Sequence, residues 1–309
     1  MNVTCLCFHE DRTVSILQEC IRFSLLRDRY LPFASMSAQF HTATELMPPV
    51  RVQLFIRQRL VHDGLVRHAS AYRKGGQYYA EIQSRGFSSV LTKNQLVPGI
   101  HTDVTLDSLM ETYNLPHVTY QDNMQAISYI YVKDNATMWD SVIAYNYKLN
   151  RGYPYIRVPN LLCVMPRTGG QPVPVPESSL LSAGSSIHTA DMLSRIDMAN
   201  AAGEYGTFTL SNPLAEQPGI VRVRQILFDK QFAHAPTEAL RFRIAVGNRK
   251  FHARSFSYAG YCGEDLEDTV QIGNAFSAKV SRIDIRGDAT GIVTEDTFYF
   301  DDFCNPAAQ

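Results

Sequence analysis

The apolar and polar positions of the first hundred residues alternate with a period of two. Over residues 50–57 apolar side chains alternate with polar ones, and Phe55 is the one apolar residue on the polar face. The Gly75-Gly76 pair marks a turn, and the alternation resumes after it over residues 77–85. This period is typical of half-buried β-strands, because successive side chains of a strand point to opposite faces. Residues 1–100 are therefore predicted to form a meander that folds into a sheet or small barrel.

The next segment, residues 101–165, mixes helix and strand. Its clearest element is a helix over Thr137–Leu149, where Thr137 and Asp140 resemble a capping box. The apolar stripe of this helix is expected to be buried and consists of Met138, Trp139, Val142, Ile143 and Tyr147. A shorter helix is predicted after Thr105, which can cap its first turn. Strand-like runs are found at residues 125–132 and 155–165.

Proline and glycine separate this segment from the rest of the chain. Residues 166–176 carry Pro at alternate positions, which predicts an extended connection. A helix is predicted over Thr189–Ala201, and strand patterns return from Tyr205 onward. The predicted strands of this last region lie at residues 221–224, 241–246, 251–258, 283–286 and 297–300.

Together these elements predict a mainly β (α+β) protein, built from two small β-barrel-like domains with an inserted α/β element. The expected boundaries are 1–100 for the N-terminal β domain, 101–165 for the α/β element, 166–204 for a linker and helix, and 205–309 for the C-terminal β domain.

Composition agrees with a folded β protein. Hydrophobic residues make up 45% of the chain and charged residues 19%, a balance that excludes disorder as the main state. The formal net charge is −1, which gives no reason to expect specific nucleic-acid binding. Residues 1–100 carry 12 basic against 7 acidic side chains, whereas residues 166–309 carry 13 against 17. Such opposite excesses suit head-to-tail packing between copies, although solvated surfaces produce them as well.

No residue pattern predicts a catalytic centre, a cofactor or a metal site. The nine histidines are scattered without metal-ligand spacing. Ser185 and Ser186 precede His188, but they lack the strand–turn–helix setting of a nucleophile elbow. An acidic cluster does not match a calcium loop and is expected to be a solvated loop; it consists of Glu264, Asp265, Glu267 and Asp268.

Cysteine usage and the absence of long apolar runs indicate a protein that is made and folded in a cytoplasm. The cysteines form no regular framework and are expected to be free, buried thiols: Cys5, Cys7, Cys20, Cys163, Cys262 and Cys304. Residues 1–10 do not resemble a secretory signal, and no apolar run approaches the ~20 residues that a membrane span needs.

Arginine is the dominant cation, at 22 residues against 7 lysines. Arginine pairs bidentately with carboxylates and is enriched at protein interfaces. Four arginines on the polar faces of predicted strands are therefore candidate interface residues, namely Arg222, Arg224, Arg241 and Arg243. The alternative is that these faces are simply solvated.

The order of the elements resembles a known family. The N-terminal meander contains VQLFIRQRLVHDGLV and YYAEIQSRGFSSVLTKNQLVPG, a helix begins at TLDSLM, and ATMWDSVIAYNYKLNRGYPYI leads into NLLCVMP. This arrangement is similar to the baseplate hub proteins of phage tails and contractile injection systems, which include late control protein D and the N-terminal part of VgrG. The Trp139-Asp140 pair followed by Val142 and Ile143 matches a segment of that family, and the likeness is greatest over residues 40–165.

The resemblance implies a structural role without enzymatic activity. It implies a homotrimer in which two β domains per chain alternate around a ring, with the tail tube protein on one side, the central spike protein on the other, and further baseplate proteins around it. The location it implies is a virion tail or injection particle that is assembled in the bacterial cytoplasm.

Two other classes of function stay open at this point. One is a distal-tail adaptor or carbohydrate-binding virion protein, for which exposed aromatic side chains would gather on one loop face. The other is an enzyme with an unrecognised site, for which carboxylates or histidines would converge in a deep pocket.

Overall fold

The structure is a computed structural model, and it describes residues 2–216, 219–274, 276–300 and 303. Strands outnumber helices along the chain, so the predicted mainly β class is confirmed. Within these residues no helix is long and apolar enough to cross a membrane.

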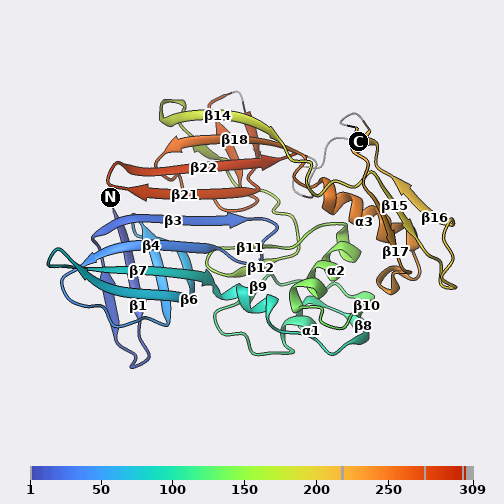
Figure 1. The fold of residues 1–309 in the computed structure, drawn as a ribbon, viewed down its shortest axis with the longest axis horizontal. Helices are drawn as coiled ribbons and strands as arrows, with labels where there is room; N and C mark the ends of the chain where they lie inside the picture. Colours follow the sequence, from blue (N-terminus) through green and yellow to red (C-terminus); the bar gives the residue numbers. More distant parts are fainter. Residues whose placement is uncertain (1, 217–218, 275, 301–302, 304–309) are drawn as a thin grey trace.

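One eleven-stranded sheet runs through the molecule and contains strands from both predicted β domains (Figure 1). Its order is β14-β18-β22-β21-β3-β4-β7-β6-β5-β1-β2. The bounds are β1 Val3–Phe8, β2 Val14–Leu17, β3 Cys20–Asp28, β4 Ser35–Thr42, β5 Arg51–Ile56, β6 Arg59–Lys74, β7 Gln77–Gly86, β14 Leu180–Ile187, β18 His252–Ala259, β21 Arg282–Asp288 and β22 Gly291–Tyr299.

The two halves of this sheet meet where β21 pairs antiparallel with β3, with Ile285 opposite Leu25. In Figure 1 the strands β14, β18, β22 and β21 lie together above, and β3, β4, β7 and β6 continue the sheet below them. Among the described residues the end strands of this sheet, β14 and β2, do not pair with each other, so the sheet does not close into a barrel. The two expected barrel-like domains are thus the two ends of one sheet.

The main core lies against one face of the sheet. Along β4, Met36, Ala38 and Phe40 are buried, whereas Ser37 between them is exposed, as the alternation of a strand requires. A small sheet contributes Val270 to the same core and consists of β13 (Val173–Val175), β19 (Thr269–Ile272) and β20 (Phe276–Lys279). The proline-rich connection has no regular structure over residues 166–172, and only its end is a strand, β13, at the edge of this small sheet.

A second core belongs to the predicted α/β element. Helix α2 (Met138–Asn150) begins with a capping box of Thr137 and Asp140, which confirms the helix and its cap. Trp139 is 5% exposed, so its predicted burial is confirmed, whereas Ile143 is only half-buried. The other elements here are η1 (Phe87–Thr92), β8 (Gly99–Val104), α1 (Leu106–Met110), β9 (Thr119–Tyr120), β10 (Ile127–Val132), β11 (Tyr155–Arg157) and β12 (Leu161–Cys163). Thr105 caps α1, as predicted.

The remaining elements form a small layer beside α2, at the right of Figure 1. A three-stranded sheet in the order β16-β15-β17 packs against helix α3, and Ile196 and Leu240 are buried between them with Tyr147 of α2. The bounds are β15 Arg195–Met198, β16 Phe208–Ser211, η3 Pro213–Ala215, β17 Val223–Ile226, η4 Lys230–Phe232 and α3 Pro236–Asn248, while η2 (Glu177–Ser179) leads directly into β14 of the main sheet.

Two predictions in this layer are wrong. The helix expected over Thr189–Ala201 is a loop followed by strand β15. The strand expected at residues 241–246 is part of α3, because the apolar positions there also recur at helical spacing and bury Ala239 and Leu240 against β15 and β16. Pro236 in the first turn of α3 was the missed signal, since proline favours that position of a helix.

Candidate assembly interface

Two long strand edges of the main sheet carry no neighbouring strand among the described residues. The first is the outer edge of β14, which pairs only with β18. The second is the distal half of β6, because β5 pairs with β6 only as far as Leu65 while residues 67–74 pair with β7 alone. Unpaired edges are sites where another chain can add a strand.

The β14 edge lacks the usual protection against such pairing. Its sequence, LLSAGSSI, has no charged residue and no proline, and a register shift near Leu180 is its one irregularity. Leu181 is 60% exposed and Ile187 is 64% exposed. Natural edge strands that stay unpaired commonly carry charges or proline. The composition of β14 is therefore typical of an edge strand that pairs with another chain.

Between these two edges the sheet shows a polar face on the side away from the main core. Small and polar side chains occupy it on every strand from β14 to β6. They include Ser182, Ser257, Glu295 and Asp284 in one half of the sheet and Ser24, Ser37, Gln39, Gln83, Glu81 and Ser70 in the other, and within each half they stand opposite one another in the registers of the paired strands. Tyr72 accepts a hydrogen bond from Gln39 Nε2 at 2.7 Å and stacks on Tyr79. A face of this kind is suited to water rather than to a protein core.

The predicted acidic loop is buried instead of solvated, so that prediction is wrong. Its residues lie against arginines that arrive from β3 and from β11. Arg27 donates to Asp265 at 2.7 Å, and the buried Arg29 forms an ion pair with Glu267. The remaining pairs are Arg157 with Asp265 at 3.6 Å and with Asp268 at 3.0 Å, Arg167 with Asp268 at 2.6 Å and Lys279 with Glu267 at 3.1 Å. This buried charge cluster joins the two halves of the sheet and the middle element into one unit.

The fourth acid of the cluster, Glu264, has a different environment. Glu264 and Asp296 are each fully buried, and neither Glu264 oxygen has a hydrogen-bond partner among the residues that the structure describes. Burial raises the pKa of Glu264; burial and then the Glu264 charge raise the pKa of Asp296. Tyr258 donates to Asp296 at 3.5 Å, and burial raises the pKa of its hydroxyl too. The pair is therefore protonated at a pH where ordinary carboxyls are ionised.

The four candidate arginines separate into two places. Arg222 and Arg224 lie at and just before β17, whereas Arg241 and Arg243 lie on α3 and not on a strand. Arg222 is exposed and donates to the carbonyls of residues 189, 190 and 192, so it fixes the loop before β15. Arg241 is exposed and pairs with Glu238 at 2.8 Å within α3.

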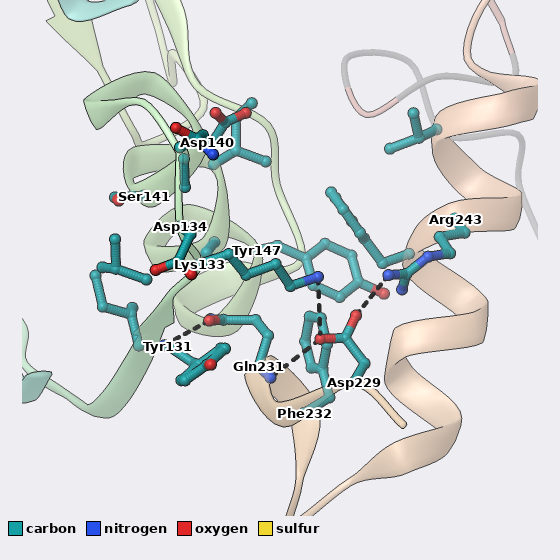
Figure 2. A pocket seen from close by; sticks show the side chains of 18 of the residues that line it. Tyr131, Lys133, Asp134, Asp140, Ser141, Tyr147, Asp229, Gln231, Phe232 and Arg243 are labelled. Carbon is teal, nitrogen blue, oxygen red and sulfur yellow. Dashed lines mark hydrogen bonds and ion pairs between the residues drawn. The ribbon is translucent and has the colours of Figure 1, made fainter. Parts of the chain in front are cut away.

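Arg243 belongs to a cluster of polar side chains that lines one wall of a cavity (Figure 2). Figure 2 shows Asp229 between Arg243 at 2.6 Å and Lys133 at 3.7 Å. Although burial opposes it, the Arg243 guanidinium lowers the pKa of Asp229. Gln231 accepts from the Tyr131 amide at 2.6 Å on the same wall. The cavity has a volume of about 410 Å³, and mostly apolar side chains of α2, β10 and α3 line it.

The residues that the sequence suggests for catalysis do not form a catalytic site among the described positions. Ser186 lies 3.1 Å from His188 on the exposed end of β14, with no carboxylate hydrogen-bonded to that imidazole in the described part of the chain. No group of three or more His, Cys, Asp or Glu side chains there is arranged to hold a metal ion. Cys5, Cys7 and Cys163 are buried free thiols, as predicted, while Cys20 is half-buried and Cys262 is exposed. Cys304 lies outside the described residues.

Known structures share this fold. The tail protein from Neisseria meningitidis MC58 matches with a TM-score of 0.74 and 11% identity, over 100% of this chain and 99% of that one. The 43 kDa tail protein of prophage MuSo2 from Shewanella oneidensis matches with a TM-score of 0.73 and 10% identity, over 96% and 98% of the two chains. The c3393 protein of E. coli, a type VI secretion component with structural similarity to the T4 tail proteins gp27 and gp5, gives 0.55 and 7%, over 90% and 73%.

The resemblance in the order of elements is thus confirmed at the level of the fold, which is that of phage tail proteins and of a type VI secretion component. No protein-family model matches the chain, and no curated protein matches it by sequence.

Proposed function

We propose that the chain is a structural subunit of a phage-type tail or contractile injection particle, and that it works there as a ring-forming homo-oligomer. The main support for this proposal is that two strand edges are free, β14 and residues 67–74 of β6. They lie at the two ends of one stretch of sheet that has a polar face. The fold agrees with it, because the solved structures that share it are tail proteins and a secretion-system component.

The direction of the strands supports closure by head-to-tail contacts. From β14 to β6 the sheet has eight strands, and every neighbouring pair is antiparallel. With an even number of strands, β14 and β6 run in opposite directions. The β14 edge of one copy can therefore pair antiparallel with the β6 edge of the next copy, and the sheet continues without a break. Contacts of this heterologous type close into a ring when the rotation per subunit allows it.

A ring built in this way would leave a channel lined by the polar face. Three copies would supply 3 × 8 = 24 strands, and barrels of about 16–18 strands already leave an aqueous channel. Residues 1–100, which supply β6, have a basic excess, and residues 166–309, which supply β14, have an acidic excess. Opposite excesses of this kind suit head-to-tail packing between copies.

The finer role within the particle is part of the same proposal, and the resemblance in the order of the elements supports it. We place the homotrimer at the baseplate as a hub, with the tail tube protein on one side of the ring and the central spike protein on the other. Arg222, Arg224, Arg241 and Arg243 lie outside the edges that close the ring, so they are candidates for contacts with other baseplate proteins.

Cross-linking tests the ring directly. The variant Ser185→Cys/Ala69→Cys places one thiol on each free edge, and oxidation should give reducible dimers and trimers. Ser185→Cys combined with Val14→Cys, which lies on the opposite outer strand β2, should give none. Images of assembled particles should show threefold symmetry around a central channel. A chain that stands alone in assembled particles, without contact to its copies, would refute the proposal.

A further inference from the structure

A second surface of the molecule combines an open strand edge with a surplus of arginine. Strand β17 is the outer strand of the small sheet in the described part of the chain, since β15 is its one neighbour. A groove of about 730 Å³ lies between the start of β17 and helix α3. Its lining includes four arginines and one acid, namely Arg222, Arg224, Arg243, Arg249 and Asp191. Three of the four arginines that the sequence singled out thus meet in one groove.

The charges of this groove are only partly satisfied within the chain. Arg243 is paired with Asp229 at 2.6 Å. The Arg224 side chain is exposed and makes no hydrogen bond or ion pair within the described residues. Arg249 contacts the ring of Tyr30 at 4.8 Å, and its Nε has no hydrogen-bond partner in the described part of the chain. A partner that brings carboxylates would therefore complete pairs which the chain leaves open.

The groove also offers apolar contacts beside the cations. Val221 is 85% exposed and Val223 is 49% exposed, while Phe242 and Val246 of α3 form the opposite wall. An extended peptide can add to a free strand edge with its backbone, and its side chains then alternate between the two faces of the sheet. The combination of edge, apolar walls and arginines fits a peptide whose acidic residues alternate with apolar ones.

We propose that the groove between α3 and β17 binds an acidic, extended segment of another protein of the same particle. The choice of a neighbour in the particle rests on the proposed function, whereas the binding of an acidic peptide does not. A protein segment is favoured over nucleic acid, because the apolar walls can pack against the apolar side chains of a peptide.

Fluorescence anisotropy with the purified full chain tests this inference. The probe is a labelled octapeptide of glutamate alternating with valine, and the matched probe has lysine in place of glutamate. We expect the glutamate peptide to bind and the lysine peptide not to bind. Arg224→Glu should weaken binding of the glutamate peptide at least ten-fold, and Arg224→Gln should weaken it less. Arg241→Glu, a charge reversal on α3 outside the groove, should change it less than two-fold.

Other outcomes would overturn the inference. Equal weakening by Arg224→Glu and Arg241→Glu, in variants whose thermal unfolding matches the wild type, would show non-specific attraction. Failure of the glutamate peptide to bind at millimolar concentration would show that the groove is not a peptide site. Tighter binding of a single-stranded DNA octamer than of the peptide would assign the groove to nucleic acid. None of these results bears on the cross-linking of β14 to β6, so the two proposals fail separately.

Discussion

Arg27 donates from Nη1 to Oδ1 of Asp265 at 2.7 Å, and the two residues are 238 positions apart in the chain. Arg27 belongs to β3 in the N-terminal part of the sheet, whereas Asp265 follows β18 in the C-terminal part. Both side chains are largely withdrawn from water, at 3% and 12% exposure. The contact therefore holds together two regions that the sequence presents as separate domains.

We predict that Arg27→Met destabilises the fold by about 3–5 kcal/mol, because it removes the shorter of the two ion pairs of a buried carboxylate, at 2.7 Å against 3.6 Å to Arg157. Urea unfolding of the purified chain measures this change. Arg22→Met on the same strand is the matched control, since Arg22 is 69% exposed and its contact with Glu81 is long, at 3.8 Å. The control should lose less than about 1 kcal/mol. If the two variants lose the same free energy of unfolding, the buried pair of Arg27 and Asp265 does not stabilise the fold more than an exposed pair does.

The buried charge cluster illustrates what the sequence does not contain. Four acids within five positions after Cys262 have the local composition of a solvated turn. Their burial depends on arginines from β3 and β11, and no local pattern links residues that are more than a hundred positions apart. The pairing of the sheet brings them together, and only then do the acids have partners.

The buried acids Glu264 and Asp296 should make stability fall as the pH rises. Their pKa values are raised in the folded state by burial, so folding favours the protonated forms. This contribution is fully present below the ordinary carboxyl pKa of about 4 and is lost as the pH rises through the folded pKa values. Glu264→Gln should gain stability relative to the wild type as the pH increases, as measured by thermal unfolding between pH 5 and 9. If the difference in stability between Glu264→Gln and the wild type is the same at every pH in this range, Glu264 does not titrate there.

His62 should have the opposite effect at lower pH. It is 1% exposed, lies 2.9 Å from Ser84 Oγ, and burial lowers its pKa to about 4. The unfolded chain takes up this proton near pH 6.5, so stability is lost as the pH falls from there toward 4, by about 3 kcal/mol in all. His62→Gln should show a smaller loss between pH 7 and 4 in chemical unfolding. The exposed His234→Gln should behave like the wild type, and a His62 variant that does so too would contradict the assignment.

We predict that Trp139→Ala destabilises the fold by about 3–5 kcal/mol, because a large side chain is removed from a packed core. Trp139 is 5% exposed and its ring lies 6.5 Å from that of Tyr153. Ile100→Ala is the control, since Ile100 is 69% exposed. The melting temperature of Trp139→Ala should be clearly lower than that of Ile100→Ala. An unchanged melting curve for Trp139→Ala would show that packing of Trp139 in this core does not stabilise the fold.

The two helices α2 and α3 show which local structure can be predicted. Thr137, Asp140 and the apolar stripe of α2 all indicate the same element, so its start was predictable from local signals. In α3 the alternation of Arg241, Phe242, Arg243 and Ile244 fits a strand as well as a helix. Contacts with β15, β16 and Tyr147 decide in favour of the helix, and those partners are distant in the sequence.

The last prediction concerns the uncharged edge of β14. Leu181→Lys/Ile187→Lys should abolish the cross-linking and self-association of the chain, because lysine on an edge strand opposes the addition of another strand. Both side chains are mostly exposed, at 60% and 64%, so the folded monomer should keep its stability within about 0.5 kcal/mol. Val14→Lys/Ile16→Lys on β2 is the matched control: it also adds two lysines to exposed apolar positions of an outer strand, at 49% and 61% exposure. Because β2 lies at the other end of the sheet, beyond the free half of β6, the ring should tolerate this pair of substitutions. Sedimentation of the two variants, together with their incorporation into particles, distinguishes the edges. Loss of assembly in the β2 variant alone would place the subunit contact at β2 and refute the pairing of β14 with β6.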